Sequence, residues 1–407
     1  MAKDATRNQL CHGQGAFVTD SESRRYVDLA NSFGSILLGH ADPDVASAVE
    51  SVIRDGIPAT GTRHLAEVLA QKISHDCGGD ASVAFFKTGT AAVRSAVGAS
   101  RRATGRNVIV SAGYHGWDPM WAPSRSQFGV NQDGVFESYY VVEELERFLQ
   151  LNKDRVAAAV ISPDYVHLST DQLHDIFFLC KKYCPLVVAD EVKYGYRFDL
   201  GPSIHRIGLK ADLYTFSKGL SNGWSLACLV GDPEVVRFLH SASSTLTYEA
   251  SSLAASIATL KKLSESKIYG NIAMEGARFI NNAKLLIKKH SLPIEIAGQG
   301  GLFQFIVGDE EMEQSFFSEC GEAGLLLLPY DNQAPSWAFR ETVVDIALAS
   351  LDRALYNLAN EFQQLKDTPL RQEMRWHAAW NQMEGFPYKE TDKSWMESKL
   401  MEHCLSG

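Results

Sequence analysis

The sequence predicts an α/β protein with a mostly parallel central sheet covered by helices, joined to a smaller α+β domain. Between about residues 61 and 265, short and nearly continuous apolar runs alternate with amphipathic segments of helical periodicity. Strands that are apolar on both faces are typical of a parallel sheet with helices on either side. After residue 266 the order changes to a long helix, two strand-like runs and further helices, which indicates a second, smaller domain.

The large domain is predicted to extend over residues 61–265. Its predicted strands are the runs SVAFF, NVIVSA, VAAAVIS, PLVVAD, LYTFS and LACLVG. Helices are predicted between several of these strands, because apolar residues recur there every three or four positions. They include GTAAVRSAVGASRRAT, VVEELERFLQ and TDQLHDIFFLCKKY.

The two ends of the chain are predicted to form the rest of the protein. Residues 1–60 should pack with the small domain, and the alternation of apolar and polar residues over 15–30 predicts a hairpin. The small domain, residues 266–366, has predicted strands at IEIAGQ and LFQFIVG and a last helix at 341–362. Residues 367–407 contain three tryptophans and are predicted to be an appended helical element.

Composition narrows the classes of partner. The chain has 407 residues and a formal net charge of −10, with 45% hydrophobic and 22% charged residues. This balance favours a soluble globular protein and argues against nucleic acid or an anionic membrane as the partner. No apolar run has the roughly 20 residues that a membrane span needs. Because the first residues also lack the apolar segment of a secretion signal, we expect a cytoplasmic protein.

The seven cysteines do not indicate disulfides or a metal site. They are odd in number and scattered through apolar segments, which is typical of reduced, buried thiols. Cys180 and Cys184 have the spacing of one helix face, but no second pair with metal-ligand spacing accompanies them. We therefore expect no bound metal.

A turn with two hydroxyls follows the first predicted strand of the sheet. Thr88, Gly89 and Thr90 close this strand and open a helix, at the sheet edge where α/β proteins usually bind ligands. Free N–H groups and the helix dipole at such a start suit a phosphate. The same residues also suit a threonine N-cap with a glycine in the turn, and the motif alone leaves both interpretations open.

Two more strand ends carry aromatic and acidic residues. Tyr114 and His115 follow NVIVSA, and an aromatic side chain there suits either stacking on a flat cofactor ring or a place in the core. Asp190 ends PLVVAD. A carboxylate at the end of a buried strand needs a cationic or hydrogen-bonded partner, and a protonated pyridinium nitrogen, a metal or an arginine would each serve.

Lys218 lies one strand further along, 28 residues after Asp190. A lysine held against apolar surroundings has its ammonium form destabilised, so its amine becomes available for imine formation. A lysine amine, a buried aspartate, a stacking aromatic and a phosphate-binding turn are together what pyridoxal phosphate (PLP) requires. The combination is more specific than any one of its members, and we predict this cofactor.

Over about residues 15–360 the chain resembles the class III aminotransferases of fold type I, and it looks closest to their glutamate-1-semialdehyde aminomutase-like branch. Four segments are similar to motifs of that branch: GRNVIVSAGYHGWD, VVADEVKYGYR, FSKGLSNG and DLANSFGSILLGHADPDV.

The resemblance implies a role for each candidate residue. Lys218 is expected to form the Schiff base, Asp190 to pair with the pyridinium nitrogen and Tyr114 to stack on the ring. The phosphate is expected on Thr88, Gly89 and Thr90, with Thr245 reaching it from a partner subunit, and further cofactor contacts at His115, Val192 and Ser217.

On the substrate side, the resemblance implies contacts at Ser32, Phe33 and Ser162. Weaker similarity adds Arg63, Tyr330 and Trp337 as candidates, although Arg63, like Arg340, equally suits a place on the surface or in an interface.

The sequence also departs from the family pattern. Ala91 stands where the family usually has a glutamate, and Ser162 where a strand-end glutamate is usual. Residues 248–250 are Tyr-Glu-Ala instead of Gly-Asn-Pro. These changes spare the lysine, the aspartate and the aromatic, so we expect retained cofactor chemistry with an altered substrate.

The predicted function is therefore transfer of an amino group between an amino donor and a small or sugar-like carbonyl substrate, through Lys218 and PLP. The alternative is an isomerase, either an aminomutase or an amino-group epimerase, which uses the same residues. The resemblance further implies a homodimer whose active sites are shared across the subunit interface.

Overall fold

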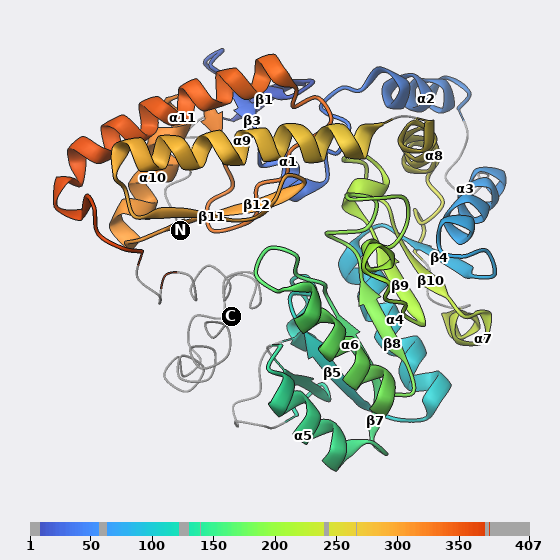
Figure 1. The fold of residues 1–407 in the computed structure, drawn as a ribbon. Helices are drawn as coiled ribbons and strands as arrows, with labels where there is room; N and C mark the ends of the chain where they lie inside the picture. Colours follow the sequence, from blue (N-terminus) through green and yellow to red (C-terminus); the bar gives the residue numbers. More distant parts are fainter. Residues whose placement is uncertain are drawn as a thin grey trace. The chain divides into compact units, whose positions relative to one another are not determined.

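The computed structural model describes residues 9–56, 63–121, 130–138, 140–239, 244–265, 267–370 and 374 (Figure 1). They divide into two compact units. The small unit contains the described residues within 1–46, 165–167 and 262–379, and the large unit contains those within 47–164 and 168–261. The predicted helical tail lies outside the described residues, apart from 367–370 and 374.

The described part of the large unit contains a seven-stranded sheet in the order β4-β10-β9-β8-β7-β5-β6. β10 pairs antiparallel with β4 and β9, and the other neighbours are parallel, which confirms the predicted mostly parallel sheet. The sequence did not predict β6, because three residues are too few to show a period. The strands are β4 (Ser82–Phe86), β5 (Val108–Ala112), β6 (Val135–Glu137), β7 (Val156–Ile161), β8 (Val187–Asp190), β9 (Leu213–Phe216) and β10 (Ala227–Gly231).

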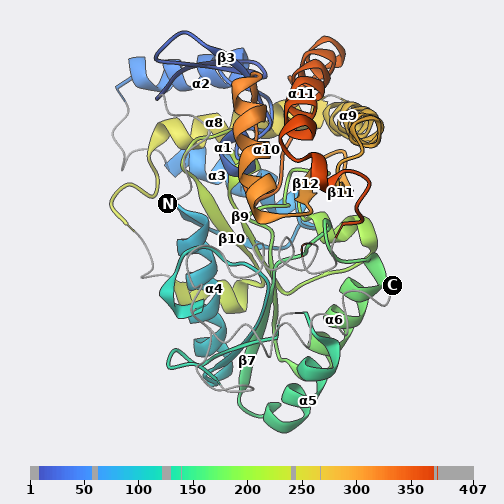
Figure 2. The ribbon, with the colours of Figure 1, turned by 90° about the vertical axis from the view of Figure 1, so that its left-hand side faces the viewer.

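Helices cover this sheet on both faces. Figure 2 shows α4 on one side of the strands and α5 and α6 on the other. The helices of the large unit include α3 (Arg63–Asp76), α4 (Gly89–Thr104), α5 (Val142–Asn152), α6 (Thr170–Tyr183) and α7 (Pro233–Val236), and α8 (Ala250–Glu265) begins in it. Apolar residues of α4, including Ala92, Val93 and Ala96, are buried in one cluster with Ile109 and Val188 of the sheet. The α/β architecture is thus the one that the alternating pattern predicts.

Local signals fix both ends of α4. The Thr88 side chain accepts a hydrogen bond from the N–H of Ala91, so Thr88 is the N-cap of the helix. At the other end Gly105 adopts a left-handed conformation with φ of 68°, which glycine tolerates without a steric penalty. The helix therefore begins at the sheet edge where the strand-end residues gather.

The small unit has two sheets, one in the order β1-β2-β3-β13 and one made of β11 and β12. β2 and β3 pair antiparallel, which confirms the hairpin predicted over residues 15–30. β13 pairs parallel with β3, so a C-terminal strand lies in the same sheet as the N-terminal hairpin. The strands are β1 (Leu10–Gln14), β2 (Phe17–Asp20), β3 (Arg25–Asp28), β11 (Ile294–Gln299), β12 (Leu302–Val307) and β13 (Leu325–Leu326).

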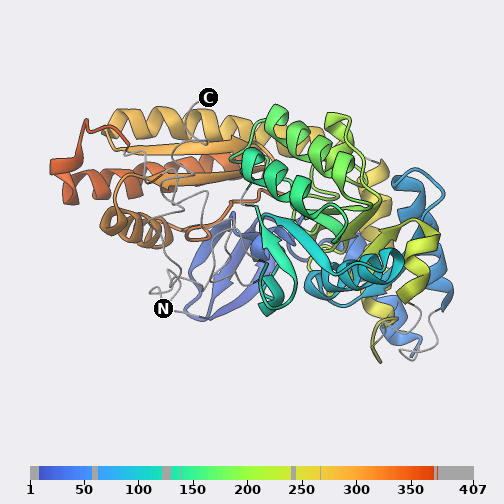
Figure 3. The same ribbon diagram turned by 90° about the horizontal axis from the view of Figure 1, so that it is seen from below.

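Three long helices complete the small unit: α9 (Ile268–His290), α10 (Glu310–Glu322) and α11 (Glu341–Glu361). Figure 3 shows β11 and β12 alongside α9. The core shared by these helices and strands of the small unit is aromatic. Its fully buried side chains include Phe279, Phe303, Phe305, Phe316 and Phe339. None of the described helices is long and apolar enough to cross a membrane. Two helices follow β3: the one-turn α1 (Asn31–Gly34), and α2 (Pro43–Arg54), which begins in the small unit and continues into the large unit.

Candidate active site

Asp190 is the last residue of β8, and three donors hold its carboxylate. Oδ1 accepts hydrogen bonds from the Thr215 hydroxyl at 3.0 Å and from the N–H of Val192 at 3.2 Å. Oδ2 lies 2.8 Å from Nδ1 of His115. The side chain is buried, so these contacts replace the water that a carboxylate loses on burial. They also fix the orientation of the carboxylate within the large unit.

His115 links two strand ends to each other. It follows β5 in a turn opened by Gly113, whose φ is 95°, and its side chain is fully buried. The imidazole lies against the Trp121 ring at a centroid distance of 4.7 Å. Nδ1 faces Asp190, whereas Nε2 is buried with no hydrogen-bond partner in the described part of the chain. Tyr114, its neighbour, is half-buried on the same turn.

Lys218 lies three residues beyond Thr215, which is paired with Asp190 across β8 and β9. Its φ is 40°, in the left-handed region that lysine seldom adopts. Such strain, of order 1–3 kcal/mol, persists only where the surroundings hold it, and it concentrates at functional sites. The hydroxyl of the preceding Ser217 donates to the carbonyl of Leu226 at 2.9 Å, and this hydrogen bond stabilises the backbone bend at Lys218.

The turn at residues 88–90 adjoins these strand ends. A Cβ built on Gly89 would lie 2.7 Å from Cγ1 of Val192 and 3.5 Å from Cβ of Ser217, so only a glycine allows this close approach. A Cβ built on Gly116 would likewise lie 2.6 Å from the Thr90 hydroxyl oxygen. The structure therefore brings the turn, the Asp190 strand end, the Lys218 bend and the His115 turn together at one edge of the sheet.

The sequence left the role of Thr88 open between phosphate contact and N-cap. In the structure its side chain caps α4 by accepting a hydrogen bond from the N–H of Ala91. Thr88 is also exposed, so it lies at the surface of the sheet edge that carries Asp190 and Lys218. The first N–H groups of a helix have no intrahelical acceptor. The start of α4, with the half-buried Thr90, thus offers backbone donors and a hydroxyl for an anion.

Glu191 is a buried acid directly beside Asp190. Its Oε1 accepts from the N–H of Ile204 at 3.0 Å, while Oε2 has no partner within the described residues. Burial raises the pKa of Glu191 to about 7, although hydrogen bonds from Ser203 and Ile204 oppose that rise. This raised pKa could not be predicted from the sequence, because it depends on complete enclosure of the side chain.

The expected substrate residues are divided between the units. Ser162 directly follows β7 in the large unit, where its N–H donates to the carbonyl of Ala112 at 2.9 Å and its Cβ lies 3.2 Å from a Cβ built on Gly113. Ser162 is therefore beside the Tyr114 turn. Ser32 and Phe33 belong to the small unit, in a turn where they have φ values of 50° and 57°.

The weaker substrate candidates differ in setting. Arg63 begins α3 with its side chain 93% exposed and pairs with Glu67 at 3.8 Å, as expected of a surface residue. Arg340 lies over the Trp337 ring at 4.3 Å in the small unit. Tyr330 has a left-handed φ of 61°. Burial raises the pKa of its hydroxyl.

Thr245 is exposed on a turn of the large unit. The turn is closed by the N–H of Ser244, which donates to the Thr247 hydroxyl at 3.0 Å. Sequence reasoning missed three residues around this turn and the strand ends: Thr215, Lys87 and Glu249. Thr215 could have been suspected, because a hydroxyl in an otherwise apolar strand requires a partner. Lys87 and Glu249 are far apart in sequence and carry no such signal.

An edge of this kind suits PLP. A fixed carboxylate is available for a ring nitrogen, a lysine lies one strand away, and the first N–H groups of α4 are available for a phosphate. The cofactor is indeed PLP, as is typical of the family that the chain matches, and the protein is a PLP-dependent enzyme. Residues 2–355 match the family described as aminotransferase class-III, so the chain belongs to the class III aminotransferases.

Curated relatives differ in reaction. The chain is 30% identical to 2'-deamino-2'-hydroxyneamine transaminase of Streptomyces kanamyceticus, over 75% of this chain and 80% of that one. It is 29% identical to glutamate-1-semialdehyde 2,1-aminomutase of Thermus thermophilus, over 85% and 91%. The predicted family and enzyme class are thereby confirmed.

Solved structures share the fold. The FumI protein of a Sphingopyxis species, in its PLP internal aldimine form, superposes with a TM-score of 0.80 at 22% identity, over 88% of this chain and 90% of that one. A β-phenylalanine aminotransferase from Variovorax paradoxus gives a TM-score of 0.77 at 21% identity, over 89% of each chain. At such identity the likeness shows the fold, fold type I, and the predicted fold class is confirmed.

Proposed function

We propose that this aminotransferase moves an amino group between an amino donor and a small or sugar-like carbonyl substrate, with Lys218 and Asp190 as catalytic residues. The pairing of Asp190 with Thr215, three residues before Lys218, is the observation that carries the proposal. It brings a fixed carboxylate and a strained lysine to the ends of neighbouring strands. Tyr114 follows the strand end at which His115 contacts Asp190.

Bound PLP supplies an electron sink for the carbanion that forms at the substrate. Asp190 holds a proton on the ring nitrogen, and its own orientation is kept by His115 and Thr215. Lys218 would hold the cofactor in the resting enzyme, and its amine, once free, would move a proton at the substrate carbon. Tyr114 orients the ring by stacking.

The phosphate is proposed to bind at the start of α4, on Thr88, Gly89 and Thr90. Val192 and Ser217, which both adjoin Gly89, complete the cofactor contacts. A phosphate bound there would be stabilised by the helix dipole and by the free N–H groups of the first turn.

The sugar-like substrate class is supported by the name of the Streptomyces relative, 2'-deamino-2'-hydroxyneamine transaminase, which indicates a substrate that carries a hydroxyl group. Ser32, Phe33 and Ser162 are proposed to contact the substrate. Ala91 and Ser162 stand where the family usually has glutamates, so this side would be less acidic and would accept a different molecule.

An isomerase is the second candidate, because the Thermus relative is a glutamate-1-semialdehyde 2,1-aminomutase. The two functions differ in whether the amino group leaves with the cofactor. The test is to mix the purified enzyme with single amino donors and no acceptor. A transaminase converts the cofactor stoichiometrically to its amine form and releases a keto product. An isomerase rearranges its substrate, and its cofactor keeps the resting spectrum at the end of the reaction. That second outcome would overturn the aminotransferase proposal.

We further propose a cytoplasmic homodimer with shared active sites, with Thr245 reaching the phosphate of the neighbouring subunit. Its exposed place on a turn supports this, because a residue that serves another chain must be accessible in its own. Exposed apolar side chains that follow it on the same turn, Leu246 at 54% and Tyr248 at 42%, suit burial in an interface.

A further inference from the structure

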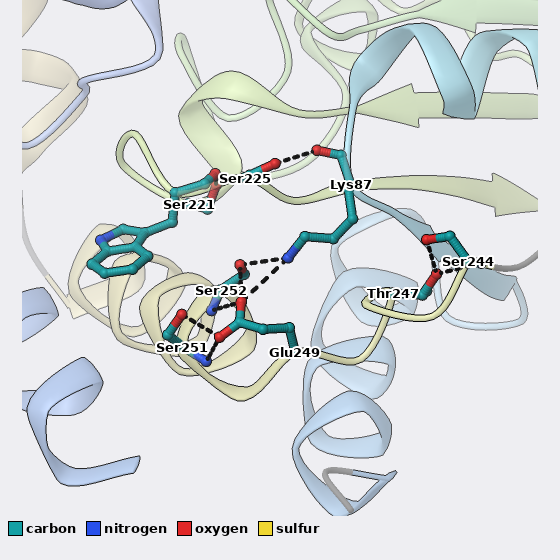
Figure 4. A network of polar contacts seen from close by, with 9 residues as sticks. Lys87, Ser221, Ser225, Ser244, Thr247, Glu249, Ser251 and Ser252 are labelled. Atoms are coloured by element: carbon teal, nitrogen blue, oxygen red, sulfur yellow. Dashed lines mark hydrogen bonds and ion pairs between the residues drawn. The ribbon is translucent and has the colours of Figure 1, made fainter. Parts of the chain in front are cut away.

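Lys87 is the residue between β4 and the turn at 88–90, and its side chain reaches a distant segment. Nζ donates to the Ser252 hydroxyl at 2.7 Å and lies 3.3 Å from Oε2 of Glu249 (Figure 4). The two charged side chains are 23% and 32% exposed, so the ion pair is partly shielded from water. Lys87 thus connects the proposed phosphate turn to the start of α8.

Glu249 is more than a surface partner of Lys87. Its carboxylate accepts from the N–H of Ser251 at 2.7 Å and from the N–H of Ser252 at 3.2 Å, and it accepts from both serine hydroxyls as well. It therefore caps α8. Burial tends to raise the pKa of Glu249, but the hydrogen bonds from Ser251 and Ser252 outweigh it and lower the pKa to about 2. Glu249 is therefore an ionised carboxylate at neutral pH.

The backbone of Lys87 has a third contact. Its carbonyl accepts from the Ser225 hydroxyl at 2.6 Å (Figure 4). Ser225 lies in the loop between Lys218 and β10. Lys87 is consequently where three segments meet: the phosphate turn, the loop after Lys218 and the turn that carries Thr245, which ends at Glu249.

An exposed ion pair contributes about 0–1 kcal/mol to stability. This pair is different because other contacts hold each partner in place. The carbonyl of Lys87 accepts a hydrogen bond from Ser225, and the carboxylate of Glu249 accepts hydrogen bonds at the start of α8. Displacing either one moves a segment that is proposed to contact a phosphate: residues 88–90 contact that of their own subunit, and Thr245 contacts that of the neighbouring subunit. The geometry therefore links the position of the Thr245 turn to the position of residues 88–90.

We propose that Lys87 and Glu249 are positioning residues for the cofactor phosphate. Their ion pair holds the Thr245 turn and the start of α8 against the phosphate turn, so that the affinity for PLP depends on the pair. The inference rests on the phosphate site proposed above. It assigns the pair no contact with the reacting atoms.

The test titrates the full-length apoenzyme with PLP and, separately, with pyridoxal, which lacks the phosphate. Lys87→Met and Glu249→Gln should each raise the Kd for PLP about tenfold, the order expected for losing a hydrogen bond to a charged group. The double variant should bind PLP no more weakly than the weaker-binding of the two single variants, because each single substitution already removes the same interaction. The Kd for pyridoxal should change less than twofold, and Lys87→Arg should restore most of the PLP affinity.

The matched control is Lys181→Met, which removes another partly exposed ion pair of the large unit, to Asp212 at 2.8 Å. It should leave both Kd values unchanged. If Lys87 instead attracts the phosphate by charge alone, Glu249→Gln would tighten PLP binding, and the proposal would be overturned. It would equally be overturned by additive effects, by unchanged PLP affinity, or by equal losses for PLP and pyridoxal.

Folding and the site itself are checked separately. Melting of each apo variant shows whether it is folded, and if Lys87→Met does not fold, Glu249→Gln and Lys87→Arg decide the question by the same criteria. A wild-type apoenzyme that binds pyridoxal as tightly as PLP would place the phosphate elsewhere, and the proposed phosphate site, not only the ion pair, would then fail.

Discussion

Replacing Asp190 in two different ways should separate catalysis from folding. The alanine variant removes the acceptor of three hydrogen bonds and leaves the buried donors of His115 and Thr215 without a partner. The asparagine variant keeps the shape and keeps an oxygen for Thr215 and Val192. Its amide NH2 group faces Nδ1 of His115, which can accept a hydrogen bond from it in the other tautomer of the ring.

The structure sets the magnitudes. Each buried group left unpaired costs about 1–3 kcal/mol, so Asp190→Ala should lower the free energy of unfolding by about 2–6 kcal/mol. Asp190→Asn should lower it by less than about 1.5 kcal/mol, since the contacts are kept. Both variants lose the negative charge beside the ring nitrogen. We expect kcat to fall at least about 100-fold in both, which corresponds to roughly 3 kcal/mol of barrier.

The assay pairs urea unfolding of the apoenzyme with single-turnover kinetics of the PLP-loaded enzyme. The expected pattern is a folded, stable Asp190→Asn protein that binds PLP and reacts slowly. If Asp190→Asn turned over at the wild-type rate, the ring nitrogen would have another partner and the role given to this strand end would be wrong. If the asparagine variant were as unstable as the alanine variant, the hydrogen-bond account of this carboxylate would be refuted.

Three other predictions concern the same edge of the sheet. Burial raises the pKa of Glu191 to about 7 from 4.5, so the folded chain keeps a proton that the unfolded chain releases, and stability should fall as pH rises from about 5 to 8. Glu191→Gln should flatten that fall and stabilise the protein at pH 8; a wild-type stability that does not decline over this range would contradict the assignment. Thr90→Val and Thr245→Val should each weaken PLP affinity about tenfold or more, with little effect on the rate of the loaded enzyme, and unchanged affinity by titration would move the phosphate site. Mixing inactive Lys218→Ala chains with inactive Thr245→Arg chains should partly restore activity, because one site of the mixed dimer carries neither lesion; a monomer in sedimentation, or no recovery after subunit exchange, would exclude shared sites.

The sequence was most informative where a pattern repeats over many residues. The six apolar strands and the helices between them could be predicted because parallel strands are apolar on both faces. The strand-end residues Asp190, His115 and Lys218 could be predicted to lie near one another for the same reason, since successive strands of such a sheet end at one edge. The short β6 (Val135–Glu137) had no such pattern.

Contacts between distant segments could not be predicted. The approach of Gly89 to Val192, and the Lys87–Glu249 pair across 162 positions, depend on how loops pack in three dimensions. The left-handed backbone of Ser32 and Phe33 also leaves no mark in the sequence, because neither residue type favours it. Substrate contacts are least predictable for this reason, as they lie on such irregular segments.

The central claim is that Lys218 binds the cofactor covalently, and reduction of the holoenzyme with borohydride followed by peptide mass mapping tests it most directly. Reduction converts a lysine–PLP imine into a stable secondary amine that survives digestion. We predict one modified peptide in the wild-type protein, carrying the cofactor on Lys218, and none in Lys218→Ala, which should also lose the visible absorption band of the lysine-bound cofactor. Stoichiometric modification of a different lysine in the wild-type protein, or a full-intensity band in Lys218→Ala, would contradict the claim.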